Sequence, residues 1–274
     1  MKSKNRKLPI SAVMVLYNNE KVLERAIKSF YDLVDELVIV HDGKCTDKSL
    51  DIAKKYTNRI YIRPHIGEAE PQRPFTYKMA KNDWILQIDA DEYLSKELRD
   101  EVPLLIQRNV DIYDTPWPIL QKNKLYFGPY KRMLFKKSKI YFIGVVHEYP
   151  KALSENVRLE KAKNALIHDP GYDNSSFLIF RTKWTRMARI HAKQYLADFK
   201  TLPKWNYTKN VWDYPTNVRL KHPILYGMIL TTIYHQLRGL ENIFKYKSLY
   251  IFKQEIYISL YFSLVFFYVK FKKI

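Results

Sequence analysis

The sequence predicts an α/β fold in which a mostly parallel sheet is flanked by helices and followed by a helical C-terminal extension. Two observations predict it. Short apolar runs alternate with segments of helical periodicity through the first hundred residues, and this alternation indicates right-handed crossovers between parallel strands. After about residue 110 the runs become shorter, and from Pro223 onward the chain is largely apolar, aromatic and basic.

Four strands and four helices are expected in the first half. Apolar residues of the first helix recur at spacings of three and four residues, and Thr46 and Ser95 are predicted to cap the second and fourth helices. The expected strands are 9–17, 36–40, 59–63 and 84–88, and the expected helices are 20–31, 46–56, 71–81 and 95–107. The apolar run at 8–17 follows a basic start but lacks a small-residue cleavage site, so we interpret it as a buried strand rather than a targeting segment.

The second half is expected to contain shorter strands and then helices. Strands are predicted within 111–119, 124–135 and 139–146, with turns at Gly128-Pro129 and Lys137-Ser138. A basic amphipathic helix is predicted over about 175–199.

Two apolar stretches near the C-terminus, 223–234 and 256–271, are shorter than the ~20 residues that a spanning helix needs. Aromatic residues beside Lys270, Lys272 and Lys273 are typical of a helix that lies in a membrane interface. A packed helical hairpin and a re-entrant pair are the alternatives.

The composition limits the classes of molecule that the chain is expected to bind. The formal net charge of +19 implies an anionic partner, such as a membrane surface, a phosphorylated substrate or nucleic acid. No RNA-binding motif is visible, so we expect no nucleic acid partner. The single cysteine, Cys45, excludes an intrachain disulfide and agrees with a reducing, cytoplasmic compartment.

Polar clusters follow three of the predicted strands. Tyr17-Asn18-Asn19, His41-Asp42-Gly43 and Asp89-Ala90-Asp91 all lie where a strand ends. Ligands of open parallel sheets bind beyond the carboxyl ends of the strands, so these clusters predict the site.

The pair Asp89 and Asp91 predicts a metal site. Residues i and i+2 of an extended segment point the same way, and two convergent carboxylates repel unless a cation joins them. Mg²⁺ or Mn²⁺ suits such oxygen ligands and would neutralise a departing diphosphate. The alternative is an acidic strand end without a ligand. Asp42 could accept hydrogen bonds from a base or ribose, or form an ordinary Asp-Gly turn.

The chain resembles family 2 glycosyltransferases. The resemblance is carried by Ser11-Ala-Val-Met-Val-Leu-Tyr-Asn-Asn-Glu20, His41-Asp-Gly-Lys-Cys-Thr-Asp47 and Trp84-Ile-Leu-Gln-Ile-Asp-Ala-Asp-Glu92. Arg132-Met-Leu-Phe135, Val146-His-Glu148 and His168 resemble the branch that includes lipopolysaccharide-core glucosyltransferases. Departures from the family pattern are His41, Lys44-Cys45 and Pro71-Gln-Arg-Pro74.

The resemblance implies a GT-A fold, a nucleoside-diphosphate sugar donor with UDP favoured, Mn²⁺ or Mg²⁺, and inversion at the anomeric carbon. It implies that Asp89 faces ribose or metal and that Asp91 binds the metal. It also implies that the nucleoside contacts Tyr17, Asn19, Glu20 and Asp42.

An inverting transfer needs a general base, and we expect Glu148 in that role with His147 orienting it or contacting the acceptor. Asp169 is the alternative base. His168 is a candidate metal or diphosphate ligand, or a hydrogen-bonded turn histidine. Arg73 is the preferred diphosphate-binding arginine.

These expectations divide the chain into a catalytic domain over 8–172, a basic helix and connector over 173–222, and an aromatic, basic helical segment over 223–274. We expect a saccharide or lipid-linked acceptor and a peripheral location on the inner face of the cell membrane. The alternative functions are a GT-A-like nucleotidyltransferase and a non-enzymatic basic protein that binds membrane or RNA. The first strand ends without the glycine-rich loop of nucleotidyltransferases, which disfavours the former.

Overall fold

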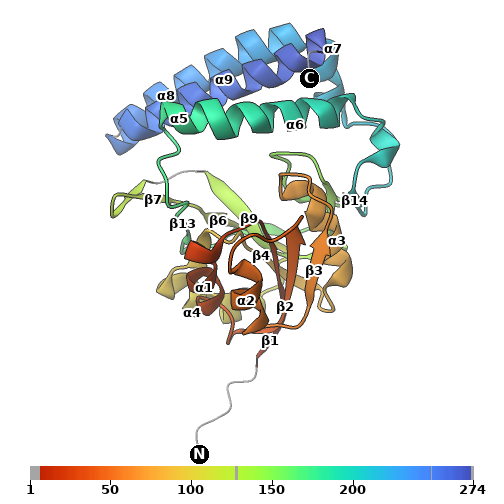
Figure 1. Cartoon of the computed structure of the whole chain (residues 1–274), viewed down its shortest axis with the longest axis vertical. Coiled ribbons are helices and arrows are strands. Elements are labelled where there is room, and N and C mark those ends of the chain that lie inside the picture. The colour runs from red at the N-terminus through yellow and green to blue at the C-terminus, as the bar shows by residue number, and fades with distance from the viewer. Residues whose placement is uncertain (1–6, 127–128, 248, 273–274) are drawn as a thin grey trace, which may run out of the picture. The chain divides into compact units, whose positions relative to one another are not determined.

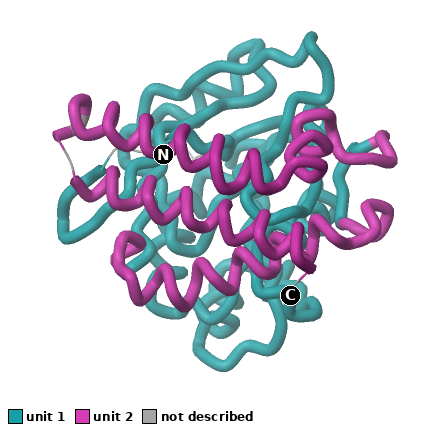
Figure 2. The backbone as a smooth tube through the Cα atoms, turned by 90° about the horizontal axis from the view of Figure 1, so that it is seen from above, with its two compact units in different colours: residues 1–171, 203–207 teal, residues 172–202, 208–274 magenta. Residues whose placement is uncertain are grey.

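The structure is a computed structural model that describes residues 7–126, 129–247 and 249–272 (Figure 1). Gly128 of the predicted Gly128-Pro129 turn, and Lys273 of the tail, lie outside these residues. The chain forms two compact units, Met1–Gly171 with Pro203–Tyr207, and Tyr172–Leu202 with Thr208–Ile274 (Figure 2). Pro203–Tyr207, assigned above to the connector, therefore belongs to the first unit.

A seven-stranded sheet forms the centre of the first unit, in the order β12-β6-β9-β4-β1-β2-β3. Of these seven described strands, β9 alone runs opposite to the rest, since it pairs antiparallel with both β4 and β6. The strands are β1 (Leu8–Leu16), β2 (Val34–Asp42), β3 (Ile60–Arg63), β4 (Trp84–Gln87), β6 (Ile112–Pro116), β9 (Tyr130–Lys136) and β12 (Leu159–Lys161). The predicted mostly parallel sheet is confirmed.

Among its described residues, two smaller sheets and four α-helices complete this unit. One sheet has the order β5-β13-β7-β8 and the other β11-β10-β14. Their strands are β5 (Glu92–Leu94), β13 (Leu166–His168), β7 (Ile119–Gln121), β8 (Lys124–Tyr126), β11 (Lys151–Ala152), β10 (Ile140–Ile143) and β14 (Lys204–Trp205). The helices are α1 (Glu20–Lys28), α2 (Ser49–Lys54), α3 (Arg73–Met79) and α4 (Lys96–Leu105), with 3₁₀ turns at Glu70–Gln72 and Lys137–Lys139.

Alternation along β1 divides the core between the two faces of the sheet. Ile10, Ala12, Met14 and Leu16 join a cluster that includes apolar residues of α1, α2 and α4. Val13 points to the other face and packs in a cluster with α3. Successive strand residues face opposite sides, so a strand covered on both faces is apolar throughout.

The two predicted helix caps differ in outcome. The Ser95 hydroxyl accepts a hydrogen bond from the backbone N–H of Leu98 at 3.1 Å, so that cap is confirmed. The predicted Thr46 cap is wrong, because α2 begins at Ser49 with Lys48 in the capping position. Thr46 instead exchanges two hydrogen bonds with the side chain of Asn18, at 2.8 and 2.9 Å.

The second unit is helical. Helix α9 packs against α6 and against the segment formed by η5 and α8. Its helices are α5 (Phe177–Ile179), π-helical η3 (Phe180–Trp184), α6 (Thr185–Leu196), α7 (Tyr214–Lys221), π-helical η5 (Ile224–Leu230), α8 (Thr231–Tyr246) and α9 (Leu249–Phe271). Among the described residues, no helix has the length and apolar character needed to cross a membrane.

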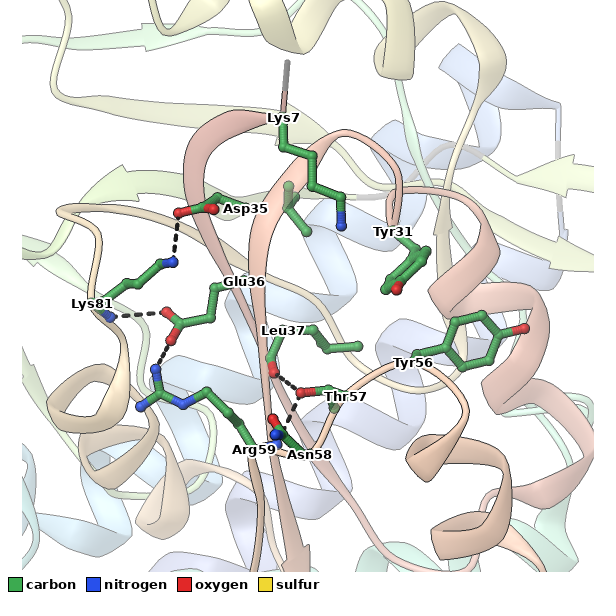
Figure 3. A pocket seen from close by; sticks show the side chains of 11 residues that line it. Lys7, Tyr31, Asp35, Glu36, Leu37, Tyr56, Thr57, Asn58, Arg59 and Lys81 are labelled. Carbon is green, nitrogen blue, oxygen red and sulfur yellow. Dashed lines mark hydrogen bonds and ion pairs between the residues drawn. The ribbon is translucent and has the colours of Figure 1, made fainter. Parts of the chain in front are cut away.

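A buried carboxylate ties the amino ends of the strands together. Glu36 of β2 accepts hydrogen bonds from the Ser11 hydroxyl at 2.5 Å and the Lys81 N–H at 2.9 Å, and it forms an ion pair with Arg59. Glu36, Arg59 and Lys81 line a cavity of about 360 Å³ (Figure 3). One side chain thus links β1, β2, the start of β3 and the turn before β4.

We expect Glu36→Ala to lower the free energy of unfolding by about 3 kcal/mol, because it leaves buried donors of Ser11 and Lys81 without an acceptor. Urea unfolding measures the loss. Asp35→Ala is the control, since Asp35 pairs with Lys81 at 2.9 Å on the surface and should cost no more than about 1 kcal/mol. Equal losses in both variants would contradict the role of Glu36.

Candidate active site

At the carboxyl end of β1, Tyr17 presents a half-exposed ring. The ring centroid lies 4.7 Å from that of His65 and 5.9 Å from that of His41. Tyr17 is 47% exposed, so its side chain is accessible to a ligand at this edge of the sheet.

Asp42 ends β2 and organises the loop that follows β3. Its carboxylate accepts hydrogen bonds from the backbone N–H groups of Ile66 at 2.9 Å and Gly67 at 2.8 Å, and from the Gln72 side chain at 2.7 Å. His65 Nδ1 lies 3.0 Å from the same carboxylate. Asp42 therefore shapes this edge of the sheet from a buried position.

Asn19 and Glu20 connect the start of α1 to the loop before α2. The Asn19 N–H donates to the Ser49 hydroxyl at 2.7 Å, and the Glu20 N–H donates to Asp47 at 3.0 Å. The Glu20 carboxylate accepts from the Lys48 N–H at 3.0 Å. These bonds position the exit of β1, and contact of either residue with a nucleoside stays a prediction.

Beyond β4, a charge cluster surrounds Asp89. The Asp89 carboxylate contacts Arg73 at 3.1 Å and Lys131 at 2.6 Å. The Lys131 ammonium also contacts Glu92 at 2.5 Å, and the Asp89 N–H donates to Glu92 at 2.9 Å. Lys131 therefore bridges two carboxylates that are three residues apart.

Burial and neighbouring charge oppose each other in this cluster. Burial alone would raise the pKa of Asp89, but Lys131 and Arg73 hold that pKa well below its usual range. Burial would lower the pKa of Lys131, but Asp89 and Glu92 raise it. Burial raises the pKa of Glu92 despite the attraction of Lys131. Asp89 is therefore held ionised by its two cations.

Trp117 joins this cluster to His168. Its indole N–H donates to Glu92 at 2.6 Å, and the Lys131 ammonium lies 5.3 Å from its ring centroid. The ring stacks on His168 with centroids 4.6 Å apart and planes 11° apart. The stack fixes the orientation of the imidazole beside β5 and β13.

Asp91 and His168 are the pair that best fits a divalent metal. His168 Nε2 lies 3.4 Å from Asp91 Oδ2, and the buried Nδ1 atom of His168 has no hydrogen-bond partner. Within the described residues, no three His, Cys, Asp or Glu side chains converge as a preformed metal site. The carboxylate suits Mn²⁺ or Mg²⁺, and the imidazole could complete the shell of Mn²⁺ if diphosphate oxygens supply other ligands.

The predicted base shares a cavity with Asp89. A cavity of about 420 Å³ is lined by Asp89, Arg73, His147 and Glu148, among others. Glu148 pairs with Lys151 at 3.0 Å and follows His147, whose backbone has a positive φ of 63°. The left-handed turn at His147 follows β10 and brings both side chains to this cavity.

Asp169, the alternative base, is engaged elsewhere. Its carboxylate forms an ion pair with Arg25 at 2.5 Å, and its backbone N–H donates to the Asp91 carbonyl at 2.8 Å. It does not line the cavity that contains Glu148. This geometry favours Glu148.

Sequence reasoning missed three residues of the site: Lys131, Glu92 and Trp117. Glu92 ends the Trp84–Glu92 motif, and Lys131 directly precedes the Arg132–Phe135 motif. No local pattern in the sequence marks either residue as part of a site. Pairing of β9 with β4 brings Lys131 to the acidic strand end, although Lys131 is 42 residues from Asp89 in the sequence.

The sequence was also compared with known proteins. Residues 11–166 match the profile of Glycosyl transferase family 2. The chain belongs to this family. Its fold is accordingly GT-A, and the assignment favours sugar transfer over the nucleotidyltransferase and non-enzymatic alternatives.

Three relatives of this chain align over 100 to 111 residues. An uncharacterized glycosyltransferase of Rickettsia bellii is 41% identical over 38% of this chain and 35% of its own length. The lipopolysaccharide core biosynthesis glycosyltransferase LpsC of Rhizobium meliloti is 33% identical over 39% of this chain and 40% of its own length. A poly(ribitol-phosphate) beta-glucosyltransferase of Bacillus spizizenii is 33% identical over 33% of this chain and 16% of its own length. The chain thus spans well under half the length of these relatives.

In metal-free protein, we expect Lys131→Met to lower the free energy of unfolding by about 3 kcal/mol at pH 8, since the buried Glu92 and the partly buried Asp89 lose a shared cation. The loss should shrink towards pH 4. Asp89 has a lowered pKa, so its pairing stabilises the fold above the ordinary aspartate pKa and is still largely present at pH 4; the decrease over this range comes from Glu92. The raised pKa of Glu92 lets it take up a proton early in that range.

Urea unfolding at both pH values, with a chelator present, tests this dependence on Lys131. The exposed Lys96 supplies the control, because Lys96→Met should change stability by less than about 0.5 kcal/mol at either pH. A Lys131→Met loss that is the same at pH 8 and pH 4 would rule out the proposed charge bridge.

Proposed function

We propose that this family 2 chain is an inverting, metal-dependent hexosyltransferase that moves a sugar from a UDP-sugar to an acceptor hydroxyl. The observation that carries the proposal is that Asp89 and Glu148 line the same cavity. An acidic donor-side group and a separate carboxylate near the acceptor are what a single displacement requires.

Asp91 and His168 would hold a divalent cation, and Asp89 would face either that cation or the donor ribose. The cation, when bound, would offset the negative charge that develops on the leaving diphosphate. Arg73 and Lys131 add positive charge at the same strand end, where they would bind diphosphate oxygens.

The nucleoside would occupy the carboxyl ends of β1 and β2. Tyr17 offers a half-exposed ring to a base, and Asp42 organises the adjoining loop. Asn19 and Glu20 complete this edge. Their bonds to the α2 loop hold it in place before the donor binds.

In the transfer step, the acceptor oxygen attacks the anomeric carbon from the face opposite the diphosphate. A new C–O bond forms while the bond to the diphosphate oxygen breaks, and its electron pair leaves with the UDP. Glu148 takes the proton of the acceptor hydroxyl, and His147 orients Glu148 or the acceptor.

The acceptor class proposed is a saccharide or lipid-linked chain of lipopolysaccharide, cell-envelope polysaccharide or glycolipid. The names of the Rhizobium and Bacillus relatives support envelope glycans. The basic, aromatic C-terminal segment supports a peripheral location on the anionic, cytoplasmic face of the cell membrane.

Asp91→Asn is expected to lower Mn²⁺-dependent release of UDP from UDP-sugars by about a hundredfold or more, because a metal ligand is removed. Turnover across a panel of UDP-sugars, with and without a chelator, measures the effect. Asp100→Asn on the exposed face of α4 should leave turnover unchanged. If the wild type shows neither metal-dependent turnover nor UDP binding, the proposed function fails.

Glu148→Gln should reduce turnover by about 10²- to 10⁴-fold while calorimetry finds UDP affinity unchanged, because the base acts on the acceptor rather than on the donor. The exposed Glu155 gives a matched control in Glu155→Gln. Asp169→Asn separates the two candidate bases. Loss of turnover in that variant, with Glu148→Gln still active, would transfer the role to Asp169.

A further inference from the structure

The C-terminal helices differ in which of their residues are buried. Helix α9 contains the apolar stretch predicted to lie in a membrane interface, but it packs against α6 on one side and against η5 and α8 on another. Ile251, Tyr261, Val265 and Phe266 of α9 are buried. This helix is the centre of the second unit, so its apolar residues are used in packing.

The η5–α8 segment packs against α9 through small residues. Gly227 faces the ring of Phe266, and a β-carbon placed on Gly239 would lie 2.6 Å from the ring of Phe252. Glycine at these two positions therefore allows the helices to approach closely. Small residues at helix contacts are typical of bundles that pack in lipid.

The same contact is polar. His235 lies 2.5 Å from Glu255 of α9, and Arg238 lies 3.2 Å from the same carboxylate. The Ser259 hydroxyl donates to Thr232 at 3.2 Å. The side of α8 that is covered by protein therefore contains glycine, hydroxyl and charged groups.

The opposite side of this segment is apolar and exposed. We call it the apolar stripe, and its side chains are 43–82% exposed. Along α8 its members recur at spacings of three and four residues, which aligns them on one helical face. The stripe consists of Leu225, Met228, Ile229, Leu230, Ile233, Tyr234, Leu237, Leu240 and Phe244.

This distribution is the reverse of that in a water-facing amphipathic helix, which buries its apolar side and exposes its polar side. A row of large exposed apolar side chains on one helical face marks an interaction surface. Within the described part of α8 this face also contains the exposed Glu241, near the C-terminal end of the row. The polar contacts with α9 are internally paired, which suits a helix whose other side is in an apolar medium.

The charge of the second unit indicates which kind of surface the apolar stripe would contact. The second unit has 16 Lys and Arg against 5 Asp and Glu. Exposed cations occur at both ends of the stripe, Arg219 and Lys221 before it and Lys245 and Lys247 after it. Cations that flank an apolar helical face complement an anionic lipid surface.

We propose that the apolar stripe of η5 and α8 docks this chain onto an anionic phospholipid bilayer, lying in the interface with its flanking cations at the headgroups. The proposal rests on the peripheral location proposed above. Its experiment measures lipid binding rather than sugar transfer, so the two proposals can fail separately.

The test is sedimentation of the full chain with vesicles of phosphatidylcholine alone or with 30% phosphatidylglycerol, a composition chosen at roughly the anionic content that attracts basic segments. The stripe variant combines Ile233→Gln, Leu237→Gln and Phe244→Gln. Its matched control combines Leu104→Gln, Leu125→Gln and Leu153→Gln, three exposed leucines of the first unit.

The wild type and the control should bind the anionic vesicles, and bind pure phosphatidylcholine at least tenfold more weakly. The stripe variant should lose roughly tenfold in partition for each inserted side chain removed. Circular dichroism checks its fold, and Phe244→Gln alone, at the most exposed position of the stripe, provides a second variant. UDP-sugar hydrolysis should be unchanged in the stripe variant and in Phe244→Gln.

Binding of the stripe variant equal to that of the wild type would overturn the proposal. So would a wild type that ignores both vesicle types. If the wild type self-associates in sedimentation equilibrium and the stripe variant does not, the occupant of the stripe is a second copy of the chain rather than lipid.

Discussion

The pairing of the Lys131 ammonium with Asp89 and Glu92 is the interaction on which the site depends. Two carboxylates that follow a buried strand would repel each other and destabilise the fold without a cation. Lys131 supplies that cation from β9, and Arg73 supplies a second one from the start of α3. The two cations offset much of the negative charge at this strand end, and Asp91 and His168, the metal ligands proposed above, lie beside it.

Local periodicity explains what the sequence could predict. The β1–β4 strands and their helices follow from apolar spacing, and the strand ends locate Asp42, Asp89 and Asp91. Lys131 could not be predicted, because its role depends on β9 lying antiparallel between β4 and β6. The Thr46 cap failed for a related reason, since Asn18 from another strand end competes for its hydroxyl and N–H.

The C-terminal region illustrates a second limit. Both the η5–α8 segment and α9 are rich in apolar residues, so composition could not tell which of them is covered by protein. The structure separates them, because glycine, serine and a histidine–glutamate pair line the contact between the helices. In this unit the contact of η5 and α8 with α9 includes small and polar groups, whereas the contact of α6 with α9 is apolar and aromatic. In the first unit the helices pack apolar side chains against a sheet.

The position of β9 has a consequence for how the chain folds. During synthesis, β1 to β4 emerge before β9, so β4 is at first an open sheet edge whose carboxylates have Arg73 but not Lys131 as a partner. Closing that edge and supplying Lys131 happen through the same strand pairing, across 42 residues of chain. Contacts of this range cost loop-closure entropy and form late. Completion of the sheet and assembly of the charge cluster are therefore one folding event.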